Sequence, residues 1–161
     1  MSDVTIIGID PGLTGAVARI SIDGAEVVDL PVMANGKGSS KVKNQVNASE
    51  LARILDELAS PDGTIVFLER ISSMPGQGVA SMFSMGDTFG CIRGVCGALW
   101  LPTEVVTPQK WKKHFMLGAD KEVVRARAIE AFPEQPLGRK KDHNRAEALL
   151  IAKYGWDIRN H

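Results

Sequence analysis

The chain has 161 residues, and at this length we expect residues 1–161 to form a single domain. Hydrophobic residues make up 44% and charged residues 24%, as in ordinary soluble globular proteins, and the formal net charge of +0 lacks the basic excess typical of nucleic-acid-binding proteins. No apolar run approaches the length of a membrane span, and no basic head precedes an apolar stretch at the N-terminus, which argues against a membrane segment and a signal peptide.

Apolar runs and turn residues predict strands and helices in a mixed order. The expected strands are residues 4–10, 15–22, 26–32, 64–70 and 101–107. The expected helices are residues 47–60, 79–99, 108–115, 120–132 and 142–155. The first three strands can pair as antiparallel neighbours, and the later strands alternate with helices. The order predicts an α/β fold with a mixed five-stranded sheet, three antiparallel strands and then parallel ones, flanked by helices.

Glycine, proline and polar residues indicate where the expected helices and strands begin and end. Residues 34–46 are polar and rich in Gly, Ser and Lys, which predicts a mobile loop. Pro108 suits the first turn of a helix, and Gly155 is expected to end the last one.

The two cysteines, Cys91 and Cys96, fall in one expected helix and on different faces, so we expect no disulfide between them. There is no Cys/His cluster with zinc spacing. This cysteine usage is typical of a reducing compartment, so we expect a cytoplasmic protein.

A carboxylate interrupts the first expected strand. Asp10 follows the apolar run "TIIGI", and Glu69 stands near the end of "TIVFLER". The two strands can be neighbours in the sheet, and a final helix crossing it would bring Asp142 and Glu147 to the same place. Each also has an ordinary interpretation. Asp10 could cap a turn and Glu69 could form an ion pair, while on the helix Asp142 could be an N-cap and Glu147 a solvated residue.

Taken together, two carboxylates on buried strands need a common neutralising partner, which a divalent cation can supply. Oxygen ligands suit Mg²⁺ or Mn²⁺. Two such ions, about 4 Å apart, would clamp the attacking and leaving oxygens of a phosphodiester.

Basic residues are clustered despite the zero net charge. Three runs lack acidic residues: Lys37, Lys41 and Lys43; Lys110, Lys112, Lys113 and His114; and Arg139, Lys140 and Lys141. A charge run is usually a solvated face, but three runs that converge on one surface would favour a polyanion as partner.

Three motifs in order, "IGIDPGLTGA", "FLER" and "DHNRAEALLIAKYG", resemble the RuvC-type Holliday-junction resolvases, which have the ribonuclease H-like fold. The resemblance covers nearly the whole chain. Because Glu147 replaces the usual aspartate, the chain looks most similar to phage-borne or organellar branches.

The resemblance implies a set of catalytic metal ligands. Asp10, Glu69 and Glu147 match the first two and the last acidic ligands. Asn144 stands where the bacterial pattern has its third acid, so Asp142 is the expected third ligand, with His143 as the alternative. Two Mg²⁺ or Mn²⁺ ions per active site are implied.

The resemblance also implies basic residues near the scissile phosphate and an apolar wedge at the crossover. Lys121 is the best match for a catalytic lysine, followed by Lys110 and Lys113, whereas Trp111 is expected to pack in the core. Met74, in the loop after Glu69, is the candidate wedge. The other expected DNA contacts are Lys37, Lys41, Lys43, Arg139, Lys140 and Lys141.

The function implied is resolution of four-way DNA junctions by paired symmetric nicks, carried out by a homodimer joined through residues 79–99. A nuclease for flaps and forks, a ribonuclease H and a non-catalytic junction-binding protein are the alternatives. The motif "IDPGLTG" also resembles a phosphate loop of actin-like ATPases and sugar kinases. The chain is too short for their duplicated fold and lacks a second phosphate loop, so we expect no nucleotide cofactor.

Overall fold

The computed structural model describes residues 4–36 and 44–160. Its strands are β1 (Thr5–Asp10), β2 (Ala16–Ser21), β3 (Gly24–Asp29), β4 (Val32–Ala34), β5 (Asn44–Val46), β6 (Thr64–Glu69) and β7 (Thr103–Val106). Its helices are α1 (Ala48–Leu58), α2 (Val79–Ala98), α3 (Pro108–His114), α4 (Lys121–Ala131), the 3₁₀ turn η1 (Lys140–Asp142) and α5 (His143–Arg159). Every strand and helix expected from the sequence is present.

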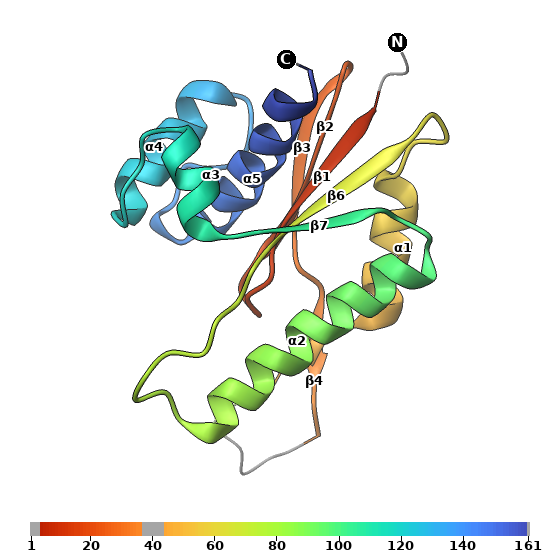
Figure 1. Cartoon of the computed structure of the whole chain (residues 1–161), viewed down its shortest axis with the longest axis vertical. Helices are drawn as coiled ribbons and strands as arrows, with labels where there is room; N and C mark the ends of the chain where they lie inside the picture. The colour runs from red at the N-terminus through yellow and green to blue at the C-terminus, as the bar shows by residue number, and fades with distance from the viewer. Residues whose placement is uncertain (1–3, 37–43, 161) are drawn as a thin grey trace.

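The main sheet has five strands in the order β3-β2-β1-β6-β7. β1 pairs antiparallel with β2, and β2 with β3, whereas β1 pairs parallel with β6, and β6 with β7. In Figure 1, α3, α4 and α5 cover one face of this sheet, and α1 and α2 lie on the other. The expected α/β fold with a mixed sheet is confirmed, as is the placement of the first and fourth predicted strands side by side.

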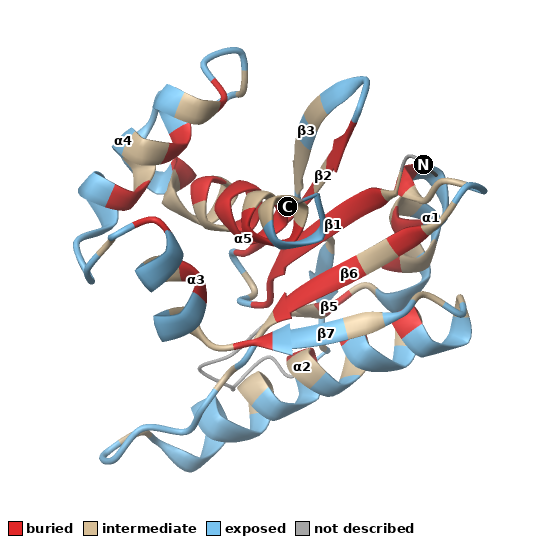
Figure 2. Ribbon diagram, turned by 45° about the horizontal axis from the view of Figure 1, so that its top comes forward, coloured by how far each residue is buried: buried red, intermediate tan, exposed pale blue. Residues whose placement is uncertain are grey.

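The central strand β1 is buried along its whole length because both of its faces carry helices (Figure 2). Ile6 belongs to the core under α5, whereas Ile7 and Ile9 belong to the core that α1 and α2 cover. Strands buried on both faces are continuously apolar rather than alternating. Burial on both faces therefore explains the unbroken apolar run "TIIGI". It also leaves the carboxylate of Asp10, at the end of the run, with little access to solvent.

Helix α5 lies against β1 with almost no side chain between the two backbones. A Cβ atom built on Gly8 would lie 2.4 Å from the carbonyl oxygen of Ala148. A Cβ atom on Gly155 would lie 2.4 Å from Cδ2 of Phe67. Gly155 therefore serves close packing, and the prediction that it ends the helix is wrong, because α5 continues to Arg159.

The segment after β3 also differs from expectation. The third strand ends at Asp29, and Val32–Ala34 then pairs antiparallel with Asn44–Val46 in a separate two-stranded sheet. Both strands have only three residues, so the sequence pattern merged Val32 with the preceding strand and gave no signal for a separate pair. The predicted loop 34–46 is wrong at both of its ends, and residues 37–43 lie outside the described residues.

Cys91 and Cys96 are free thiols, as expected. In the described part of the chain, no helix combines the length and the apolar character needed to cross a membrane.

Candidate metal centre

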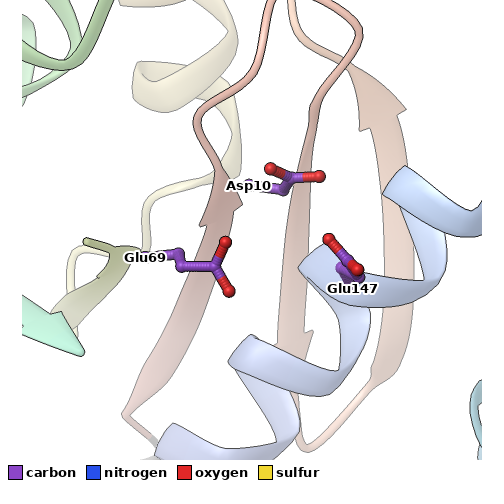
Figure 3. Close-up of side chains that lie close together, drawn as sticks. All are labelled: Asp10, Glu69 and Glu147. Carbon is purple, nitrogen blue, oxygen red and sulfur yellow. The ribbon is translucent and has the colours of Figure 1, made fainter. Parts of the chain in front are cut away.

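Three carboxylates from three elements meet at one edge of the sheet (Figure 3). Asp10 ends β1, Glu69 ends β6, and Glu147 projects from the first half of α5. Each offers a ligand oxygen that lies within 4.8 Å of the others. The parallel pairing of Ile9 with Leu68 places the next residue of each strand side by side, which is how the sheet brings Asp10 to Glu69.

Burial and mutual repulsion disfavour the negative charges of this cluster. Burial, and then the charges of Glu147 and Glu69, raise the pKa of Asp10 to about 8. Burial is also the main reason why the pKa of Glu69 is raised. A cation would reverse both effects, and three oxygen donors are the ligand chemistry that Mg²⁺ and Mn²⁺ prefer. The residues present therefore fit a hard divalent ion.

The side chain of Trp111 holds one of these carboxylates in place. Its indole Nε1–H donates to Oε2 of Glu69 at 2.6 Å, and its ring is completely buried. Thr107 caps α3 by accepting from the backbone N–H of Lys110, and Pro108 occupies the first turn. The sequence predicted only core packing for Trp111. A buried indole N–H nevertheless needs an acceptor, and that requirement is a signal that could have been used.

Both ring nitrogens of His143 have hydrogen-bond partners, and among the described residues the ring is not part of the group of three carboxylates. Its Nδ1 is 3.1 Å from the carbonyl oxygen of Lys140, which can only accept, so Nδ1 carries the hydrogen. Its Nε2 is 3.3 Å from Nζ of Lys121 and accepts from that ammonium group. The charge of Lys121 also lowers the pKa of Asp10, so this lysine belongs to the same site. His143 precedes Glu147 by four residues on α5, a spacing that places both on one helix face.

Asp142 has a different set of partners. Its carboxylate accepts hydrogen bonds from the backbone N–H of Arg139 at 2.8 Å and from Nη2 of the same residue at 2.8 Å. Nη1 of Arg145 lies 3.8 Å away. The hydrogen bonds from Arg139 keep the pKa of Asp142 below its ordinary value. The carboxyl group thus stabilises the turn η1 and the start of α5, and within the described residues it is not part of the metal-ligand cluster.

Asn144, at the position of the family's third acid, has a structural role here. Its side-chain N–H donates to the carbonyl oxygen of Thr14 at 2.6 Å and to the Thr14 hydroxyl at 3.0 Å. These bonds tie the turn between β1 and β2 to α5, and so help to fix Asp10 relative to Glu147.

A cleft of about 540 Å³ opens beside the carboxylates. Asp10 and Glu69 lie in its wall, together with Met74 from the loop that follows β6. The Met74 side chain is 70% exposed, which places the candidate wedge at the edge of this cleft.

The expected basic residues that the structure describes lie on α3, at the start of α4 and around η1. Lys110 and Lys113 are exposed on α3, and Lys121 begins α4. Arg139 and Lys141 line a second cavity of about 520 Å³ together with His143. Lys140 is exposed between them, whereas Lys37, Lys41 and Lys43 lie outside the described residues.

No protein-family model and no curated protein matches the chain. Its fold does match solved structures. Thermus thermophilus RuvC in complex with a Holliday junction substrate superposes with a TM-score of 0.63 at 17% sequence identity, over 98% of this chain and 97% of that one. A second Thermus thermophilus RuvC structure superposes with a TM-score of 0.58 at 17% identity, over 96% of this chain and 95% of that one.

Proposed function

We propose that this chain, which has the RuvC-type ribonuclease H-like fold, is a metal-dependent endodeoxyribonuclease that cuts four-way DNA junctions. The observation that carries the proposal is the cluster of Asp10, Glu69 and Glu147, in which Asp10 is buried and lines a cleft together with Glu69. A protein that only bound DNA would gain nothing from carboxylates beside the phosphates, because the like charges repel.

Four side chains are proposed to hold the metal: Asp10, Glu69, Glu147 and His143. Neither His143 nor Asp142, the third ligand expected from the sequence, is among the three clustered carboxylates. We prefer His143 because it shares a helix face with Glu147 and its Nε2 has one hydrogen-bond partner, Lys121, whereas the Asp142 carboxylate accepts several bonds from Arg139. When bound, two Mg²⁺ or Mn²⁺ ions supply electrostatic stabilisation of the attacking and leaving oxygens of a phosphodiester.

The remaining polar groups position the reactants. The Trp111 N–H fixes the rotation of the Glu69 carboxylate, as outer hydrogen bonds commonly do for metal ligands. Lys121 places a positive charge beside Asp10, where it offsets charge on the phosphate that is being cut. The exposed Met74 is proposed to contact unpaired or unstacked bases at the crossover.

The substrate class is tested by one cleavage assay with four DNA forms. A four-way junction, a flap, a linear duplex and an RNA–DNA hybrid of matched sequence are incubated with the protein and Mg²⁺, and again with EDTA. We expect Mg²⁺-dependent cuts at symmetry-related positions of the junction and little cutting of the duplex. Preferred cutting of the flap would indicate a broader branched-DNA nuclease, and preferred cutting of the hybrid would indicate a ribonuclease H. Either result would contradict the proposal.

A homodimer joined through α2 is proposed because symmetric nicking needs two equivalent active sites. Gly86, Gly90 and Gly94 lie on an exposed face of α2, and a Cβ atom on any of them would meet open space. Each glycine costs a helix about 1 kcal/mol relative to alanine. Close approach of a second helix would offset that cost.

Gly90→Arg is therefore expected to give a folded monomer. The open space at Gly90 and the higher helix propensity of arginine preserve the protomer, while the bulky charge blocks a close helix pair. Sedimentation at micromolar concentration should show a dimer for the wild type and a monomer for the variant, with unchanged circular dichroism. Asp56→Arg, on the exposed face of α1, serves as the matched control and should remain a dimer. A wild-type protein that sediments as a monomer, free and on a junction, would rule out this interface.

A further inference from the structure

Two helices of this chain end in the same way, with a bulky residue where glycine is usual. Trp100 follows α2 with φ of 57°, and Met116 follows α3 with φ of 56°. The backbone N–H of Met116 bonds to Lys113 and that of Leu117 to Lys112, in the pattern of a Schellman motif. This motif places its penultimate residue in the left-handed region, where side chains other than glycine are disfavoured.

Packing within the chain does not offset the strain at Met116. Its side chain is 87% exposed, so it gains little from burial. A large apolar residue that is both strained and solvent-exposed is retained against two unfavourable contributions. Residues in sparsely populated backbone regions cluster at active sites and ligand-binding segments. Trp100 has a similar backbone conformation and exposure, so the surroundings of Met116 must distinguish the two.

The surroundings of Met116 indicate which partner it contacts. A hollow of about 760 Å³ lies at the end of α3, lined by Met116, Leu117, Pro108, Lys112 and Lys113 among others, with no acidic residue in the lining. Among the described residues, neither lysine forms an ion pair with a carboxylate. An apolar surface beside two cations fits a nucleic-acid strand, which offers base and sugar surfaces and phosphates together.

This hollow adjoins the metal centre. Pro108 lines both the hollow and the cleft that contains Asp10 and Glu69. A strand held at the carboxylates can therefore continue over Pro108 toward the end of α3.

We propose that the DNA strand cut at the carboxylate cluster runs across Pro108 into this hollow, where Met116 packs against the base or sugar of a nucleotide flanking the scissile phosphate. Lys112 and Lys113 hold the adjoining phosphates. This inference rests on the proposed nuclease function, and it names residues that contact the substrate outside the cleft that Met74 lines.

The two Schellman motifs provide a matched pair of variants. Met116→Gly removes the proposed contact and relieves the backbone, so its Tm should be equal to or above that of the wild type. Trp100→Gly makes the same backbone change at the end of α2, in a residue that lines neither the cleft nor the hollow. We expect junction affinity to fall about tenfold in Met116→Gly, as for loss of one apolar nucleotide contact, and to stay unchanged in Trp100→Gly. Met116→Leu keeps an apolar side chain and should bind like the wild type.

An abasic scan locates the contact on the DNA. Junctions that lack one base at a time near the cut site are titrated with the wild type and with Met116→Gly. At one flanking position the abasic substitution should weaken wild-type binding and have no further effect on the variant, which is the signature of a shared contact. If every abasic position weakens both proteins equally, the contact does not exist.

The outcomes separate this inference from the proposed function. Met116→Gly binding as tightly as the wild type, or Trp100→Gly losing as much affinity, would overturn the inference while wild-type cleavage of the junction upholds the nuclease. A wild-type protein that neither binds nor cuts the junction would overturn both.

Discussion

Asp10→Asn is expected to abolish cleavage while raising the free energy of unfolding of the metal-free protein by about 1–3 kcal/mol. The substitution keeps the shape of a side chain that is 7% exposed and removes its charge. Burial and two neighbouring carboxylates make that charge unfavourable in the folded state. Junction binding should survive, because the carboxylate repels phosphate rather than attracting it.

The stability gain should depend on pH with a defined sign. The pKa of Asp10 is about 8 in the folded protein and 3.8 ordinarily, so its folded form prefers the neutral acid. The wild-type protein in EDTA should therefore be most stable relative to the variant below about pH 4, and it should lose stability as the pH rises toward 8. Urea unfolding of both proteins between pH 4 and 9 measures the difference. Adding Mg²⁺ should stabilise the wild type more than the variant, and equal curves without metal would contradict the assignment.

His143→Ala and Asp142→Asn are expected to have opposite effects on activity and stability. His143→Ala should lower the rate of junction cleavage by about 100-fold or more. A residue that only hydrogen-bonds to a metal ligand would cost less when removed. The stability of His143→Ala should change little, because the hydrogen bonds of the imidazole to the described residues go to Lys121 and the carbonyl of Lys140. Asp142→Asn should lower the free energy of unfolding by about 1–3 kcal/mol, since it weakens charge-assisted bonds to Arg139.

Cleavage by Asp142→Asn, measured below its Tm and per folded molecule, should stay near the wild-type rate. His143→Gln provides the matched control, because it keeps a polar side chain of similar length but lacks the imidazole lone pair. If Asp142→Asn is inactive although folded, and His143→Ala is active, then the third ligand is the aspartate and η1 rearranges when metal binds.

The first two carboxylates of the site could be predicted from the sequence because strands have a simple geometry. Asp10 and Glu69 both end apolar runs of similar length, and parallel neighbours bring their carboxyl ends to one edge. The choice between Asp142 and His143 is harder, because it depends on helix phase and on which carboxylate the nearby arginines bind. Asp142, the ligand expected from the sequence, lies five residues before Glu147. Helix phase instead favours His143, which lies four residues before Glu147 and so on the same helix face. The pairing of Asp142 with Arg139 and Arg145 involves a 3₁₀ turn that no periodicity in the sequence predicts.

Other features depend on contacts between distant segments. Gly155 has the signature of a helix end, and only the position of Phe67 on β6 shows that it is a packing site. The pairing of β4 with β5 joins two three-residue strands, which are too short for alternation in the sequence to reveal. Neither contact can be predicted from the residues near it in the sequence.

The bond from Trp111 to Glu69 also gives the protein an internal fluorescent reporter of its candidate metal centre. The chain has three tryptophans, of which Trp100 is 91% exposed and Trp111 is completely buried with its N–H on a candidate ligand. A charge arriving at Glu69 changes the electric field along the indole ring, and that field sets the colour and yield of its emission. Metal binding should therefore change the tryptophan fluorescence of the native chain, which can be measured without a label and without DNA. The paramagnetism of Mn²⁺ would make it quench where Mg²⁺ only shifts the spectrum.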